Sequence, residues 1–422
     1  MFILISQLSY MYSNTHRKCV ILSKVRGDEM QAQKRLLLLL ILTVAAFAWA
    51  ALSRPETKGR GISPTSLGTP YQPANSDTVK KDSPSGKELF LQSCATCHGA
   101  DGTGAPQTQL GFATRPADFT NCNFATREPN ADWIAVAHEG GAIRGFADDM
   151  PAFGDALTGQ QLQKIMNYIR TLCTEDDWPR GELNLPKPLY TTKAYPEDEA
   201  VLSSTVNAED RGAITNQLLY EQRIGARGMF EVAVPFGYRE MPNGNWSGGH
   251  LGDVALGGKY VLYDNLSSGS ILSLGGEVLL PSGSEANGFG SGTTVIEPYL
   301  TYGKILPAGF FGHLQTGGGI PLLQDKASNE VFGRGVLGKT FVPSQWGRTW
   351  SPMVEVLGSQ ELESGAPVHW NIVPQMQVSL NQRQHLRLNI GASVPLDDPS
   401  RTTQLRVYLL WDWFDGGLSE GW

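Results

Sequence analysis

Apolar and polar residues alternate along most of the second half of the chain. Between residues 369 and 380, every second side chain is apolar and most of the others are amides or hydroxyls. A period of two residues predicts a β-strand with one apolar face. The pattern recurs in eleven segments: 214–224, 227–236, 250–263, 270–280, 294–305, 309–320, 329–341, 349–358, 367–380, 384–395 and 403–413. Because no helical stretch separates them, they predict an antiparallel meander.

Several features of these segments favour a membrane barrel. They run for 10 to 14 residues, whereas soluble strands average about 5 or 6 and strands that cross a bilayer need about 9 to 11. The face opposite the apolar one is small and polar, as in a wet lumen. Seven of the ten tryptophans lie at or after Trp246, mostly at predicted strand ends, where an aromatic belt would place them. A soluble all-β domain is the alternative.

A barrel in lipid must be closed, because an open edge would leave backbone groups without hydrogen bonds. Bacterial barrels favour even strand numbers. We therefore expect an up-and-down barrel of 10 or 12 strands, which means that the count of eleven is wrong by one.

The first half of the chain carries a helical pattern instead. In the segment 160–170, the apolar residues fall on one helical face. Stretches without a period flank this domain: residues 52–83 predict a flexible linker, and the proline-rich residues 181–212 predict an extended one. The predicted order is an all-α domain at 84–180 and a barrel at 213–422.

The N-terminal region has the plan of a secretory signal. An apolar run follows two basic residues and ends at small residues around Ala50, and this order is typical of a cleavable signal peptide. We assign residues 1–51 to a signal region and expect export, with an uncleaved anchor as the alternative. Met30 would start a signal of ordinary length, so residues 1–29 could lie upstream of the translated protein.

Composition excludes two classes of protein. The chain is 41% hydrophobic and 18% charged, which argues against intrinsic disorder. Its net charge is −7 and its body lacks a Lys/Arg cluster, so nucleic acid is not an expected partner. Many of the 48 glycines crowd the barrel half, where they permit tight turns and strand bends.

The expected chemistry centres on Cys94-Ala95-Thr96-Cys97-His98. Cys-x-x-Cys-His is the attachment signature of c-type haem. Two thiols one helical turn apart can bond to the two vinyl groups of one porphyrin edge, and the adjacent histidine can ligate the iron. We therefore expect one covalently bound haem c. A thioredoxin-like redox pair is the competing interpretation.

Haem iron takes a sixth ligand or keeps an open site, and this choice separates an electron carrier from an enzyme. The downstream candidates are His138, Met150 and Met166. Met166 lies on the apolar face of a helix, where core packing explains it. Met150 lies in a loop, next to the backbone-stiffening Pro151. We assign Met150 as the ligand, with His138 as the alternative.

Cys122 and Cys173 remain as an even pair in an exported domain. A disulfide between them would close a loop of about 50 residues and stabilise the fold by about 4 kcal/mol in the chain-entropy treatment. Two separate buried thiols are the alternative, because sequence does not give the distance between them.

These residues resemble the class I monohaem cytochrome c family over residues 84–173. The likeness rests on the helix that runs into the Cys-x-x-Cys-His string, the loop Met150-Pro151-Ala152-Phe153-Gly154 and the terminal helix that ends Tyr168-Ile169-Arg170. It implies that the first and last helices cross with Phe90 against Tyr168. It also implies that a carbonyl in the loop 115–119 orients His98.

The barrel half resembles the outer-membrane barrel family named for the phenol-degradation meta pathway. The likeness lies in the segments 370–380 and 405–413 and in the ending Trp411-Asp412-Trp413-Phe414. It implies an outer-membrane location and the passage of small hydrophobic compounds.

Together these features predict an exported cytochrome that transfers one electron at a time and is not itself an enzyme. We expect an outer-membrane barrel with a periplasmic haem domain, and a redox partner protein or a small redox molecule in the periplasm. A soluble periplasmic protein is the alternative location. A transporter with an accessory haem domain and a peroxidase-like haem enzyme are the alternative functions. The carboxylates Glu277, Glu297 and Glu355 lie on the polar face of their strands and receive no catalytic role.

Overall fold

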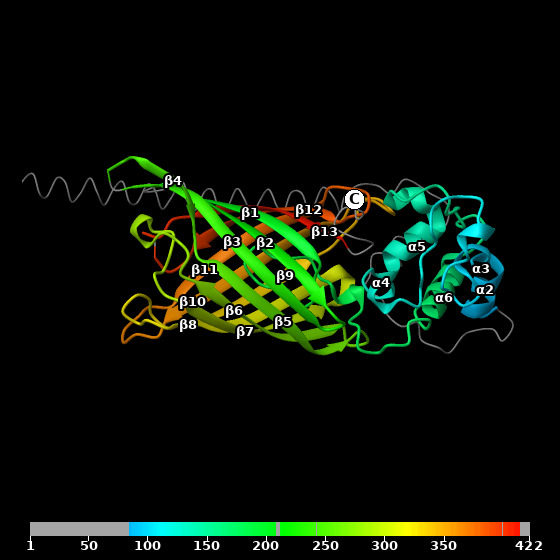
Figure 1. The fold of residues 1–422 in the computed structure, drawn as a ribbon, viewed down its shortest axis with the longest axis horizontal. Coiled ribbons are helices and arrows are strands. Elements are labelled where there is room, and N and C mark those ends of the chain that lie inside the picture. The colour runs from blue at the N-terminus through cyan, green and yellow to red at the C-terminus, as the bar shows by residue number, and fades with distance from the viewer. Residues whose placement is uncertain (1–83, 208–211, 242, 399, 414–422) are drawn as a thin grey trace, which may run out of the picture.

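A computed structural model describes residues 84–207, 212–241, 243–398 and 400–413 (Figure 1). The predicted signal region, 1–51, and the predicted flexible linker, 52–83, lie outside the described residues. A small helical domain and a large β-barrel lie end to end along the longest axis (Figure 1).

Two longer helices cross in the helical domain. α2 (Gly86–Ser93) and α6 (Gly159–Ile169) each begin with a capping box, made by Ser85 and Thr158 respectively. The rings of Phe90 and Tyr168 lie 5.3 Å apart between the two helices, which confirms the predicted contact. The other helices are α3 (Ala95–His98), α4 (Cys122–Ala125) and α5 (Asn130–Glu139), with short 3-10 turns at η3 (Gln107–Gln109), η4 (Gly141–Arg144), η5 (Gly181–Leu183), η6 (Glu285–Asn287) and η7 (Pro307–Gly309).

Among the described residues, no helix has both the length and the apolar character needed to cross a bilayer.

Twelve antiparallel strands close the barrel in the described part of the chain. β1 completes the ring by pairing with both β2 and β13. The ring strands are β1 (Glu199–Asn207), β2 (Ala213–Ile224), β3 (Gly228–Glu240), β5 (Val254–Asn265), β6 (Ser270–Leu280), β7 (Val295–Ile305), β8 (Phe310–Pro321), β9 (Glu330–Lys339), β10 (Trp350–Glu361), β11 (His369–Ser379), β12 (Leu386–Pro395) and β13 (Gln404–Asp412). A short strand, β4 (Trp246–Leu251), pairs antiparallel with the end of β3 and is not part of the ring. The predicted barrel and its even strand number are confirmed, and each of the eleven predicted segments forms a strand.

The twelfth strand, β1, lies inside the segment predicted as a linker. The barrel begins at Glu199 and not at residue 213. The strand pattern is hidden because β1 starts in an acidic run, 197–199, which resembles a solvated linker. In the structure Glu199 is buried and pairs with Lys187 at 2.8 Å and Lys193 at 3.2 Å.

The barrel is apolar outside and polar inside. Each strand of the ring exposes at least one large apolar side chain: Leu202, Leu218, Phe230, Leu256, Leu274, Leu300, Leu314, Leu337, Val354, Trp370, Ile390 and Leu409. The buried inward positions carry polar side chains instead, among them Glu221, Lys259, Ser273, Thr301, Gln315, Glu355, Gln375 and Asn389. This arrangement is the reverse of a soluble protein and is typical of a barrel in lipid.

The part of the predicted linker that precedes β1 enters the barrel. Residues 183–198, the lumen segment, are mostly buried and join the helical domain to β1. Their hydrogen-bond partners include a residue on every strand of the ring: Glu199, Glu221, Met229, Lys259, Ser273, Thr301, Gln315, Arg334, Glu355, Gln375, Asn389 and Tyr408. The lumen segment therefore bridges opposite walls of the barrel.

Apolar contacts fix the lumen segment as well. Leu185 packs in a cluster with Phe311 and Met353, and Tyr195 packs with Val261 and Ile271. An extended, proline-rich stretch suits this place because its backbone amides and carbonyls find partners on the polar wall and not within the segment.

Candidate haem site

A cavity of about 340 Å³ lies in the helical domain. Cys94, Cys97 and His98, at the start and along α3, form one part of its wall. Both thiols are free and half-buried. The turn after α3 is closed by hydrogen bonds from Gly104 to the carbonyl of His98 and from Ala105 to that of Cys97, at 2.9 and 2.8 Å. The string thus has the compact shape that its spacing predicts.

His98 lies in largely apolar surroundings. Its ring stacks on Phe119 with 4.7 Å between ring centroids. Burial lowers the pKa of His98, and the nearby backbone of Ala117 acts in the opposite direction. A neutral imidazole is the form that binds a metal ion. The loop 115–119 lies where the resemblance implies it.

The thiol of Cys94 lies in a site that disfavours charge. Burial, together with the nearby Cys97, raises the pKa of the Cys94 thiol to about 11. Both effects penalise the thiolate. In the free chain this thiol is therefore protonated at neutral pH. It then behaves as a small apolar residue of the cavity wall.

Met150 lines the same cavity from the loop after η4. Its carbonyl accepts a hydrogen bond from the amide of Gly141 at 3.0 Å, and the amide of Phe153 donates to the carbonyl of Ala137 at 3.0 Å. These bonds fasten the loop to the C-terminal part of α5 and to the start of η4. Met150 is therefore carried by a fixed backbone, although it lies in a loop.

The other two ligand candidates lie differently. Met166 is buried in the core of α6 and also lines the cavity. His138 is not among the cavity residues. Its Nδ1 lies 2.7 Å from the carboxylate of Glu139, and its ring packs 5.4 Å from that of Trp346 in the barrel.

The residues present fit a covalently bound haem. Two free thiols and the His98 imidazole share a cavity with two thioethers, those of Met150 and Met166. The remaining wall is mainly aromatic and aliphatic: Phe119, Phe124, Trp133, Val136, Phe153, Leu157, Leu162, Ile165 and Ile169. Such a wall matches an apolar macrocycle. Sulfur and imidazole donors are ligands that haem iron accepts.

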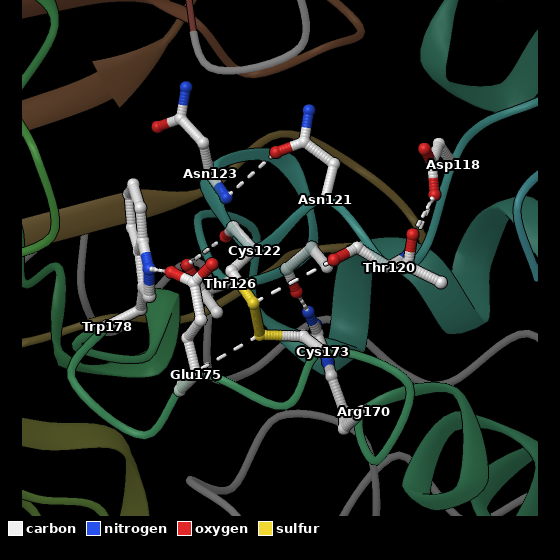
Figure 2. The surroundings of a disulfide bond; sticks show 11 residues. Asp118, Thr120, Asn121, Cys122, Asn123, Thr126, Arg170, Cys173, Glu175 and Trp178 are labelled. Carbon is white, nitrogen blue, oxygen red and sulfur yellow. Dashed lines mark hydrogen bonds between the residues drawn. A yellow bond between two sulfur atoms is a disulfide. The ribbon is translucent and has the colours of Figure 1, made fainter.

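A disulfide joins Cys122 to Cys173 next to this cavity (Figure 2). The Cα atoms are 5.1 Å apart across a sequence separation of 51 residues. The bond ties the start of α4 to the chain just after α6. Arg170 supports the same junction, because it donates a hydrogen bond to the carbonyl of Glu128 at 2.7 Å and lies 4.0 Å from the centre of the Trp133 ring.

Two turns of the barrel contact the helical domain beside the cavity. From the turn between β9 and β10, the indole of Trp346 donates to Glu139 at 2.9 Å and its carbonyl accepts from Arg144 at 2.8 Å. From the turn between β11 and β12, His385 lies 3.0 Å from the carboxylate of Glu128. The two domains therefore meet through exposed and partly buried polar contacts.

The sequence analysis misses two residues of the cavity wall. Arg383 and His385 belong to the barrel, yet they line the cavity together with the residues of α3. Their local sequence predicts only the start of a strand. They reach the cavity because two segments more than 200 residues apart come together, and a local pattern carries no signal of such a contact.

Comparison with known proteins supports the division into two domains. Residues 84–173 match the family model described as cytochrome c. A gluconate 2-dehydrogenase cytochrome c subunit from Pantoea cypripedii is 33% identical over 137 residues, which cover 30% of this chain and 27% of that protein. The matched region thus spans about a quarter of the relative's length.

Solved structures are similar to the barrel. The COG4313 outer membrane channel from Pseudomonas putida F1 is 12% identical, with 54% of this chain and 98% of that chain covered and a TM-score of 0.40. The KdgM porin is 13% identical, with 51% and 98% covered and a TM-score of 0.32.

The fold and the cavity thus define a cytochrome joined to a membrane-type barrel. Residues 84–173 form a cytochrome c domain. It is followed by a closed barrel of twelve antiparallel strands.

Proposed function

We propose that this protein is an electron carrier anchored in the outer membrane, with one haem c bound through Cys94 and Cys97 and ligated by His98 and Met150. The observation that carries the proposal is that all four side chains line one largely apolar cavity. The protein passes single electrons to or from a redox partner protein or a small redox molecule in the periplasm.

Each residue has a distinct part in this function. A bound haem supplies an iron centre that gains and loses one electron. Cys94 and Cys97 fix one edge of the macrocycle covalently. His98, which stacks on Phe119, would bind the iron through its imidazole. Met150 would supply the second protein ligand, and a methionine ligand raises the reduction potential.

A filled sixth position distinguishes a carrier from an enzyme. A peroxidase-like site needs an open coordination position for its substrate. The loop of Met150 is fastened to α5 and to η4 by backbone hydrogen bonds, so the thioether is well placed to hold that position closed. This supports electron transfer over catalysis at the iron.

The lengths of the barrel turns support a periplasmic haem domain. Most turns at the end next to the helical domain are short, at residues 225–227, 266–269, 306–309 and 380–385, with 340–349 as a longer exception. The connections 281–294, 322–329 and 362–368 lie at the opposite end. Outer-membrane barrels have short periplasmic turns and long external loops. The helical domain then faces the periplasm, where soluble redox partners are available.

The lumen segment argues against transport as the main function. It crosses the lumen and forms hydrogen bonds with residues on every ring strand. A path for small hydrophobic compounds through the centre would have to displace it. We therefore assign the barrel the role of an anchor that fixes the haem domain to the membrane.

Absorption spectroscopy tests the ligand set. Methionine sulfur bound to ferric haem gives a weak near-infrared band, and we expect this band in the oxidised protein. Met150→Ala should abolish it, and His138→Ala should preserve it. Absence of the band from the unsubstituted protein, or its loss only in the His138 variant, would overturn the assignment of Met150.

A further inference from the structure

The barrel itself contributes to the wall of the haem cavity. Arg383 and His385 come from the turn 380–385 between β11 and β12, and both line the cavity that contains Cys94 and Cys97. A cytochrome c domain of residues 84–173 alone lacks this part of the wall. The site is therefore completed by the second domain.

The cavity runs from α3 toward the barrel. In Figure 1, α3 lies at the end of the helical domain away from the barrel, and α4 and α5 lie between. A haem bonded through its vinyl groups at α3 would direct its opposite edge away from the cysteines. That edge would carry the two propionate carboxylates, and the cavity wall on that side includes Arg383.

The charged groups around the cavity differ in what they already bind. The acids are Glu128, Asp132 and Asp149, and the cationic or titratable groups are Arg115, Arg144, Arg383 and His385. Arg144 binds Asp132 through two bonds of 3.0 and 2.8 Å. His385 lies against Glu128, and Arg115 is exposed in the loop beside His98.

Arg383 occupies a different position. Its guanidinium donates to the carbonyl of Gly145 at 3.3 Å and lies 4.4 Å from the centre of the Phe146 ring. These contacts place it at the cavity wall on the barrel side. A buried carboxylate is stable only with a hydrogen-bonding cationic partner, and the planar guanidinium matches a carboxylate in shape and charge.

The turn that carries Arg383 is held in place on both sides. Gln384 has a positive φ of 65°, which is unfavourable by about 1–3 kcal/mol for such a residue. Its side chain accepts a hydrogen bond from Thr349 at 3.2 Å and donates to Asp132 at 3.4 Å. His385 then anchors the next position to Glu128. The strained turn is thus fixed against both the barrel and the helical domain.

We propose that the haem site spans both domains and that Arg383 binds a haem propionate from the barrel side. This inference rests on the proposed binding of haem c. It gives the barrel a second role, because the turn 380–385 covers the propionate edge. Electrons are then exchanged at the thioether edge, which faces away from the barrel.

Redox titration of the full-length protein tests this proposal. Arg383→Gln removes a positive charge beside a propionate and should lower the equilibrium constant for haem reduction about tenfold, or about 59 mV for one electron. Haem content per protein should not change, because the attachment is covalent. Arg383→Lys should restore most of the potential, because it returns the charge.

Arg348→Gln is the matched control. Arg348 is exposed in the neighbouring turn of the barrel and is not a cavity residue. The reduction potential of this variant should therefore equal that of the unsubstituted protein. Equal potentials for the Arg383 and Arg348 variants, or no recovery with lysine, would overturn the role of Arg383. A protein that carries no haem at all would instead overturn the proposed function.

Discussion

At the scale of single residues, a buried cation holds the cavity wall together. Arg170 donates to Asn130 at 2.9 Å, to the carbonyl of Glu128 at 2.7 Å and to the carbonyl of Ala125. Burial lowers its pKa to about 10, so it stays charged at neutral pH. One side chain thus satisfies two backbone carbonyls and an amide side chain, and it links α4, α5 and α6.

Arg170→Ala should therefore destabilise the helical domain. Two buried carbonyls lose a charged donor, and hydrogen bonds to charged groups contribute about 1.5–3 kcal/mol each. We expect a loss of about 3 kcal/mol in the free energy of unfolding, measured by denaturant titration of the haem absorbance. Arg348→Ala, an exposed control, should change it by less than about 0.5 kcal/mol. Equal stability of the two variants would contradict this role.

At the scale of elements, the close crossing of α2 and α6 depends on one glycine. A Cβ at Gly86 would meet the carbonyl of Lys164 and lie 3.1 Å from the Cβ of Tyr168. The crossing brings Phe90 against Tyr168 and leaves the inner face of α6 for the cavity. The position of α2 therefore affects the shape of the haem site.

Gly86→Ala should push the two helices apart. Overpacking of a close contact is unfavourable by about 1–3 kcal/mol, and we expect a loss of stability in this range by thermal or chemical unfolding. Gly111→Ala is the control, because a Cβ there has no neighbour within 4 Å. If Gly86→Ala left the stability unchanged, as Gly111→Ala should, the helix crossing would be shown to tolerate a side chain.

Most elements could be predicted from sequence because their periods are strong. The eleven predicted segments all form strands, and the first and last helices cross as the resemblance implies. β1 could not be predicted, because Glu199 becomes compatible with a strand only when Lys187 and Lys193 pair with it inside the lumen. Arg383 was out of reach for a similar reason, since its partners at the cavity lie in the other domain.

At the scale of the whole molecule, one segment links the two domains and crosses the barrel. Glu355 shows how firmly it is held: its carboxylate accepts hydrogen bonds from the amide of Thr191 at 2.6 Å, the hydroxyl of Thr191 at 2.5 Å and the amide of Tyr190 at 3.3 Å. The lumen segment is thus held firmly against the barrel wall. It also connects the barrel to the haem domain.

The barrel should accordingly conduct poorly in planar bilayers. We expect no steady conductance from the unsubstituted protein and brief openings from Glu355→Ala, because the lumen segment loses three hydrogen bonds. Glu361→Ala, at an exposed end of the same strand, should behave like the unsubstituted protein. A large, steady conductance without substitution would contradict the anchor role and favour transport.

The proposed function requires that a single chain carries covalent haem and lies in the outer membrane. The most direct measurement is a haem stain of outer-membrane fractions on a gel run with and without heating. We predict one haem-stained band whose mobility changes on heating, as a barrel unfolds, and which disappears when Cys94 and Cys97 are both replaced by serine. A stained band found only in the soluble fraction, or a heat-modifiable band without haem, would contradict the account.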